Sequence, residues 1–329
     1  MRARNSNVEL VRIVASLMIV GLHLGLKIFS FAWIYVEVFL ILTGYFTAKH
    51  FDGKNYDNPM KMGLVYTIKK LVLLLPYSFV ATIMMYSINF VQMVSSGEMN
   101  IVAWLINTFK SFFLDFVLIT PIDEHSIMGI LWYVSAWLYI MPVFARIAQI
   151  KNRFVIIVME LIVVLMYYEH YNGIPLITRG IPALARVWAG MGIGVLIYEL
   201  LFLVHYNYSK FGEILLTFVE ILFYLVPIIY SFKDVFDSRF FLMCFSISLC
   251  ITLSNFSLTR FIRNRLINYL GRLSCPIYFF HIAFIQICDN FLLLTGYKRI
   301  LFSYASTVAF SMVIMMIVSH FSFFSNAEK

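Results

Sequence analysis

The chain has 329 residues, of which 62% are hydrophobic and 13% are charged, and its net charge is +8. Soluble domains average roughly 45–50% apolar and about 25% charged residues, so this composition excludes a cytosolic globular enzyme, a disordered chain and a disulfide scaffold. A positive net charge can indicate nucleic-acid binding in a soluble protein, but in a membrane protein Lys and Arg collect on cytoplasmic loops. The sequence therefore predicts an all-α polytopic integral membrane protein without a nucleic-acid partner.

Ten apolar stretches are long enough to cross a bilayer as helices of about 20 residues. Polar and apolar residues do not alternate in runs such as 156–166, which argues against a β-barrel. No linker, repeat or low-complexity tract separates a second domain, so we expect residues 1–329 to form one membrane domain. The predicted spans, in chain order, are 8–27, 31–49, 71–93, 128–147, 153–170, 180–203, 211–231, 238–257, 275–295 and 301–322.

An eleventh apolar segment, 101–118, contains Lys110 and Asp115 and precedes the acidic stretch 123–125. If this segment does not span and the N-terminus is inside, the basic residues divide roughly two to one in favour of the cytoplasm. If it does span, the cluster Arg260–Arg272 lies outside and the bias nearly vanishes. We therefore expect ten spans, both termini in the cytoplasm, and a re-entrant or interfacial helix at 101–118 on the outer side.

Ionisable side chains inside membrane helices are costly and often mark functional sites. Arg12 and His23 lie eleven residues apart on the first span, which is close to three helical turns and places both on one face. Arg12 is near the cytoplasmic end and His23 near the outer end. Taken singly, Arg12 could be a snorkelling arginine and His23 a packing histidine, but their shared face favours a functional pair.

Glu37, on the second span, lies at a depth similar to His23. It could hold the tautomer of His23 and so form half of a general-base pair, or it could pair with Arg186 of the sixth span. The sequence leaves both alternatives open, and both place the three residues in one polar layer of the outer half. Trp132 and Tyr133 begin the fourth span, as part of an interfacial aromatic belt or of a substrate site.

Basic residues on the predicted cytoplasmic loops set topology or bind an anionic cytosolic ligand, since Arg and Lys suit phosphates. His281, about six residues into the ninth span, is either a packing histidine or a ligand contact. No Walker A motif, dinucleotide fingerprint, metal-binding cluster or hydrolase elbow is present, so we expect no metal and no permanently bound cofactor. The loop residues in question are Lys69, Lys70, Arg260, Arg263, Arg265 and Arg272.

Five short motifs follow one another along nearly the whole chain: 7–15 running to His23, 36–45, 69–77, 131–142, and 271–278 running to His281. In order and spacing they resemble the membrane-bound acyltransferase 3 family of bacterial glycan O-acyltransferases, in its stand-alone form. The first motif fits the family's pattern of Arg and His separated by ten residues. The chain departs from the family where relatives often carry Arg instead of Lys69–Lys70 and His instead of Ile130.

The resemblance implies transfer of an acyl group, usually acetyl, from cytosolic acyl-CoA to a hydroxyl of a cell-envelope or extracellular polysaccharide. It implies a multi-pass protein of the bacterial cytoplasmic membrane, in contact with membrane lipids and a glycan or lipid-linked sugar acceptor. His23 would be the general base or a transient acyl carrier, with Glu37 orienting it. Arg12, Lys69, Lys70, Arg272 and His281 would bind the CoA donor, with Arg12 also stabilising charge in the channel, and Arg186, Trp132 and Tyr133 would position the acceptor.

Two other classes of function compete with this interpretation. Intramembrane charges also mark transport pathways, so the chain could export a polysaccharide or flip a lipid-linked sugar, although no inverted repeat or pair of broken helices is visible. It could also be a non-catalytic partner in a glycan-synthesis complex. The presence of both Arg12 and His23 argues against a degenerate site.

Overall fold

The computed structural model describes residues 5–54, 57–97, 101–119, 126–176, 179–203, 209–233 and 236–322. These ranges are built from helices and connecting turns, and they contain no strand. Short 3-10 turns precede α2 at Lys27–Phe29 and Ala32–Ile34, precede α5 at Gly129–Leu131, and follow α9 at Leu258–Phe261. The α-helices are α1 (Ser6–His23), α2 (Tyr35–Phe51), α3 (Pro59–Ser96), α4 (Ile101–Phe116), α5 (Trp132–Ile147), α6 (Arg153–His170), α7 (Gly180–Leu203), α8 (Lys210–Ser231), α9 (Ser238–Ser254), α10 (Arg265–Arg272), α11 (Ser274–Asn290) and α12 (Gly296–Ser322).

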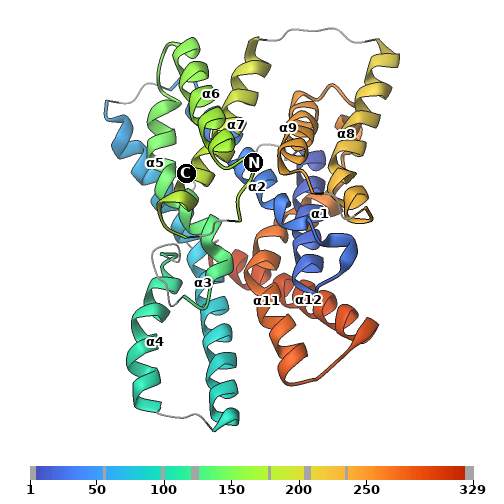
Figure 1. Ribbon diagram of the computed structural model, residues 1–329. Coiled ribbons are helices and arrows are strands. Elements are labelled where there is room, and N and C mark those ends of the chain that lie inside the picture. Colours follow the sequence, from blue (N-terminus) through green and yellow to red (C-terminus); the bar gives the residue numbers. More distant parts are fainter. Residues whose placement is uncertain are drawn as a thin grey trace.

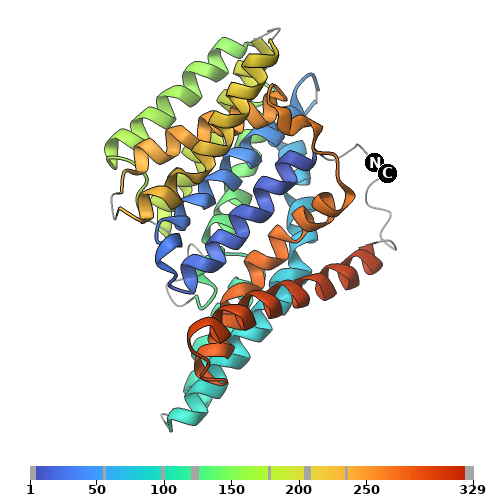
Figure 2. The same ribbon diagram turned by 90° about the vertical axis from the view of Figure 1, so that its right-hand side faces the viewer.

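Within the described residues, seven helical segments are long and apolar enough to cross a membrane, or eight if α10 and α11, bent by 49°, form one span. The chain is therefore a multi-pass membrane protein. α9 is shorter, with 17 residues, and α6 carries three charged residues in its 18. Every predicted span overlaps a helix, but ten crossings and a cytoplasmic position for both termini remain predictions. Figure 2 shows the beginning of α1 and the end of α12 toward the same side.

Two pairs of helices distant in sequence run parallel to each other. In the first pair, the Ser16 hydroxyl of α1 donates to the carbonyl of Ser274 in α11, and seven residues later the rings of His23 and His281 meet. In the second pair, Glu37 near the start of α2 bonds to Arg186 in the first half of α7, and Tyr45 further along α2 packs on Tyr198 further along α7. Ten spans would make both pairs parallel, and an additional crossing at α4 would make both antiparallel. The packing thus agrees with an α4 that adds no crossing.

α3 and α4 form a long hairpin that projects from the rest of the molecule (Figures 1 and 2). With 38 residues, α3 is about 57 Å long at 1.5 Å per residue. α4 returns along its second half, with Trp104 Nε1 donating to Asn89 and the Tyr86 hydroxyl to Asp115. Asp115 also accepts from Ser126, so hydrogen bonds account for an ionisable residue in this apolar segment. The acidic stretch 123–125 lies outside the described residues.

The start of α3 corrects the predicted third span. The helix begins at Pro59 rather than near residue 71, because the Asn58 side chain caps it by accepting from the backbone N–H of Lys61. Proline is favoured in the first turn, where its missing N–H has no partner to lose. Lys69 and Lys70 therefore lie inside a helix and not on a loop.

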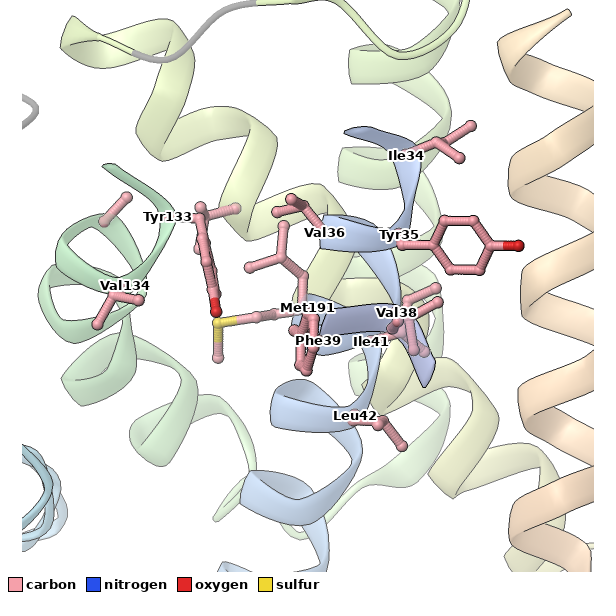
Figure 3. Close-up of a cluster of buried hydrophobic side chains, with 14 of the residues drawn as sticks. Ile34, Tyr35, Val36, Val38, Phe39, Ile41, Leu42, Tyr133, Val134 and Met191 are labelled. Carbon is pink, nitrogen blue, oxygen red and sulfur yellow. The ribbon is translucent and has the colours of Figure 1, made fainter. Parts of the chain in front are cut away.

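α2 is largely buried and packs against α5 and α7. Figure 3 shows Tyr133 of α5 and Met191 of α7 on one side of α2, whereas Tyr35 points away from them. Glycines allow the backbones of α2 and α7 to approach closely, as small residues do in membrane helix pairs. A Cβ at Gly194 would lie 2.0 Å from the carbonyl oxygen of Ile41, and one at Gly44 would lie 1.9 Å from that of Met191. This close contact fixes the register between the two helices.

Candidate active site

Two histidines meet at the end of α1. The ring centroids of His23, the last residue of α1, and His281, in the middle of α11, lie 5.1 Å apart at 47°. His23 is exposed, whereas His281 is completely buried. His281 was predicted to contact CoA near the cytoplasmic end. The structure places His281 at the level of His23 and not among the residues that line the cavity described below, because α11 starts beside Ser16.

One hydrogen bond of the His281 ring defines its tautomer. Its Nδ1 lies 2.9 Å from the carbonyl oxygen of Tyr278. A carbonyl only accepts, so Nδ1 carries the proton in the neutral ring and Nε2 carries a lone pair. Nε2 is buried and has no hydrogen-bond partner among the described residues. A buried imidazole nitrogen with an unused lone pair is chemically able to accept a proton or attack a carbonyl.

Glu37 pairs with Arg186, which is one of the two alternatives that the sequence left open. Its Oε1 accepts from Nε of Arg186 at 2.8 Å and forms an ion pair with Nη2 at 2.7 Å, and its Oε2 accepts from the Tyr168 hydroxyl at 3.4 Å. Both members of the pair are buried. These partners are not His23, so the other alternative, in which Glu37 orients His23, is not what the structure shows.

Arg186 has little capacity left for a substrate. Besides Glu37, it donates from Nη1 to the carbonyl of Pro175 at 3.0 Å, and its guanidinium carbon lies 4.7 Å from the ring centroid of Trp132. A guanidinium over an indole face is a favourable cation–π contact. Trp132 is 5% exposed, which is less than a lipid-facing aromatic belt requires. This geometry favours a structural role for Arg186 and Trp132 over the predicted contact with an acceptor.

A chain of aromatic rings connects this charged pair to the histidines. Tyr133 touches Trp132 on one side and Tyr278 on the other, with centroid distances of 6.2 and 4.7 Å. Tyr278 in turn lies 5.5 Å from His281. Its hydroxyl donates to the carbonyl of Ile130, which ties α11 to the start of α5. Aromatic side chains thus connect the two parts of the predicted polar layer, the Glu37–Arg186 pair and the histidines, and separate Glu37 from His23.

A cavity of about 240 Å³ lies below this layer, between α1, α2, α3, α5 and α11. Arg12 and Lys70 supply positive charge, and Thr43, Thr47 and Ser274 supply hydroxyls. Tyr133 is the residue that both lines the cavity and contacts the layer above it. In Figure 3 its ring stands beside Phe39 of α2, another lining residue, with the centroids 6.1 Å apart. The remaining lining residues are Leu42, Phe46, Tyr66, Leu74, Val134, Trp137, Met141 and Cys275.

Of the residues predicted to bind the CoA donor, some line this cavity and others do not. Arg12 lines the cavity and forms an ion pair with Glu9 at 3.6 Å. Lys70 also lines it, with its ammonium 5.2 Å from the ring centroid of Tyr66. Lys69 and Arg272 are exposed and do not line the cavity. Adjacent residues on a helix point about 100° apart, so only one of the two lysines can face inward.

Two tyrosines of the site received no role from the sequence. Tyr278 lies three residues before His281, on the same face of a helix, and this spacing could have indicated it. Tyr66 gives no comparable signal, because it faces the cavity only through the packing of α3 against α2. Among the described residues, no group of three or more His, Cys, Asp or Glu side chains could hold a metal ion.

Comparison with known proteins identifies the relationship that the motifs indicated. The model of the acyltransferase 3 family, described as an acyltransferase domain, matches residues 5–320, nearly the whole chain. The resemblance seen in the sequence is thereby confirmed. No curated protein and no solved structure matches the chain.

Proposed function

Because the chain belongs to the acyltransferase 3 family of acyltransferase domains, we propose that it is an O-acyltransferase of the bacterial cytoplasmic membrane. The donor is acyl-CoA, with acetyl-CoA first among the candidates, and it enters from the cytoplasm. The acceptor is a hydroxyl of a cell-envelope or extracellular polysaccharide, or of its lipid-linked precursor. Family membership supports the acyl transfer, and the site geometry supports the sidedness.

One observation carries this proposal: a buried and an exposed histidine meet at the end of α1, and a cavity with two basic residues lies along the first half of α1, at Arg12. The eleven residues from Arg12 to His23 correspond to a rise of about 16 Å. A cytosolic donor and an external acceptor both have to reach one catalytic group, and this arrangement lets each approach from its own side. The cavity is slightly smaller than the roughly 300–1,000 Å³ of whole-ligand pockets, which suits an extended acyl-bearing arm.

In the proposed reaction a histidine removes the proton from the acceptor hydroxyl. The resulting oxygen attacks the thioester carbonyl, a C–O bond forms, the C–S bond breaks, and the CoA thiolate leaves and takes up a proton. His23, which is exposed, is placed to meet the acceptor. His281, whose Nε2 is unpaired among the described residues, lies directly behind it. In a second form of the same proposal, the histidine first takes the acyl group from CoA and then passes it to the acceptor hydroxyl.

At the donor end, Arg12 and Lys70 are the side chains suited to the CoA moiety. Tyr133 and Tyr278 stand between the cavity and the histidines, so the acyl group has to pass these two rings. The ion pair of Glu37 and Arg186 holds α2 and α7 together beside this path. This assignment keeps Arg12 and Lys70 for the donor and moves His281 from the donor to the reacting groups.

The test is incorporation of radiolabel from acetyl-CoA in membranes that contain the protein, with the host's envelope glycans separated afterwards. Wild type is compared with His23→Ala, and insertion is checked for both. Label in a glycan that depends on His23 supports the proposal and identifies the acceptor class. Absence of label from a correctly inserted wild type, with the host glycans present, argues for an exporter or for another acyl donor.

A further inference from the structure

Arg299 joins the ends of the two helices that carry the histidines. From the first turn of α12, its Nη1 donates to the carbonyl oxygen of Leu24 at 2.7 Å. Its Nε and Nη2 donate to the two carboxylate oxygens of Asp289 at 2.5 and 2.7 Å. Leu24 is the C-cap residue that directly follows His23, and Asp289 lies in the last turn of α11. One planar group therefore contacts both helix ends.

These contacts are more than a surface ion pair. Exposed pairs of arginine and carboxylate contribute only about 0–1 kcal/mol to stability, and the side chains of Arg299 and Asp289 are 26% and 37% exposed. The bond to Leu24 is different, because the last carbonyls of a helix have no partner within the helix. Positive charge is also favoured at the C-terminus of α1 and disfavoured at the N-terminus of α12, to which Arg299 belongs.

The position of this contact matters because His23 is the last residue of α1. Helix ends open more easily than helix centres, so the final turn needs an external contact to stay in place. His281 needs none, since it lies in the middle of α11 and is completely buried. A displacement of about 1 Å at a catalytic group can lower a rate on the order of 100-fold.

We infer that Arg299 is a positioning residue for acyl transfer. It holds the last turn of α1 against α11 and thereby keeps the His23 imidazole against His281. This inference rests on the proposed function, since it assigns a consequence for the reaction at the same pair of histidines. It adds a residue from α12 that touches neither the cavity nor the histidine rings.

The experiment measures transfer from labelled acetyl-CoA by Arg299→Ala, Arg299→Lys and the neighbouring exposed Lys298→Ala as a matched control. Arg299→Ala is expected to lower kcat by about tenfold to 100-fold with the KM for acetyl-CoA unchanged, since Arg299 does not line the donor cavity. Lysine keeps the charge but cannot make the paired bonds to Asp289 and the bond to the Leu24 carbonyl at the same time. Arg299→Lys should therefore recover only part of kcat. Lys298→Ala should behave as wild type.

The charge-swapped double variant Asp289→Arg with Arg299→Asp separates the two contacts. It can restore the ion pair, but an aspartate at position 299 cannot donate to the Leu24 carbonyl. We expect kcat to stay lowered, as in Arg299→Ala, although the ion pair is restored. Full activity in this variant or in Arg299→Ala would overturn the inference.

A readout that needs no transfer keeps this result apart from a failure of the proposed function. Hydrogen exchange of the peptide covering residues 17–31 should be faster in Arg299→Ala than in Lys298→Ala. If wild type transfers no acyl group but exchange is faster, the proposed function fails and the contact at the helix end stands. If exchange is the same in both variants, the inference is wrong whatever the activity.

Discussion

The Ser16 hydroxyl lies between two carbonyl oxygens, 2.9 Å from that of Arg12 in its own helix and 3.2 Å from that of Ser274 in α11. Ser16 and Ser274 therefore mark a point where α1 and α11 touch. His23 and His281 each follow one of these serines by seven residues. Because α1 and α11 run parallel with the same rise per residue, both histidines arrive at the same height. The pairing of the two rings is therefore a consequence of where the two helices first touch.

The role of His281 can be tested without disturbing its packing. In His281→Asn the amide nitrogen takes the place of Nδ1 and can still donate to the Tyr278 carbonyl, but the lone pair of Nε2 is lost. We expect transfer to fall by about 100-fold or more at unchanged thermal stability. Transfer within a fewfold of wild type would show that His281 only packs against His23, and His23→Ala serves as the reference for complete loss.

Glu37 and Arg186 should behave as a structural pair. Glu37→Gln leaves a buried arginine without its counter-charge, which typically costs about 3–5 kcal/mol. We expect a clearly lower unfolding temperature in detergent, and a partial recovery when Arg186→Met is added to Glu37→Met. The pH profile of the residual transfer should keep the wild-type shape. A changed profile at wild-type stability would instead support the alternative in which Glu37 orients His23.

Lys69 and Lys70 form a matched pair for the donor site. Lys70 lines the cavity, whereas Lys69 is exposed. Loss of a charge-assisted contact worth about 1.5 kcal/mol should raise the KM for acetyl-CoA about tenfold in Lys70→Ala, with kcat little changed. Lys69→Ala should leave both constants as in wild type. Equal effects of the two substitutions would indicate general electrostatic attraction and not a defined contact.

The close approach of α2 and α7 predicts the effect of a single methyl group. Gly194→Ala would place a Cβ against the backbone at Ile41 and Tyr45, and overpacking of this kind costs about 1–3 kcal/mol or more. We expect a lower unfolding temperature and reduced transfer, since Glu37 and Arg186 lie on the same two helices. Gly129→Ala is the control, because the nearest atom to its Cβ would be 3.9 Å away. Similar stability of the two variants would contradict the tight interface.

The connection that follows α2 contains a carboxylate with an altered pKa. Burial raises the pKa of Asp52, but hydrogen bonds from Tyr198 and Arg153, at 2.6 and 2.7 Å, outweigh it and hold the pKa below the ordinary 3.8. A carboxyl with a lowered pKa stabilises the fold above its unfolded-state pKa and loses this contribution as the pH falls through the folded value.

Thermal unfolding between about pH 3 and pH 6 should therefore show a decline in stability at the acid end that is smaller in Asp52→Asn than in wild type. The amide cannot ionise, so its contribution does not change over this range. Identical pH dependence in the two proteins would mean that the Asp52 carboxyl adds nothing to the acid sensitivity of the fold.

The sequence by itself determined the class of protein and the helical segments. A composition of 62% hydrophobic residues and the length of the apolar runs suffice for this, because the cost of burying backbone polar groups in lipid allows few alternatives to helices. The Arg12–His23 face could also be predicted, since both residues belong to one helix whose periodicity is known. The family followed from short motifs in a fixed order.

Only the tertiary structure decided which side chains meet. The partner of His23 is His281, 258 residues away, and the partner of Glu37 is Arg186. Neither pairing follows from periodicity, because the sequence does not state which helices are neighbours or at what height they touch. The contact of Ser16 with Ser274 and the glycines between α2 and α7 set these heights. Packing between helices, and not any property of one helix, therefore assembled the site.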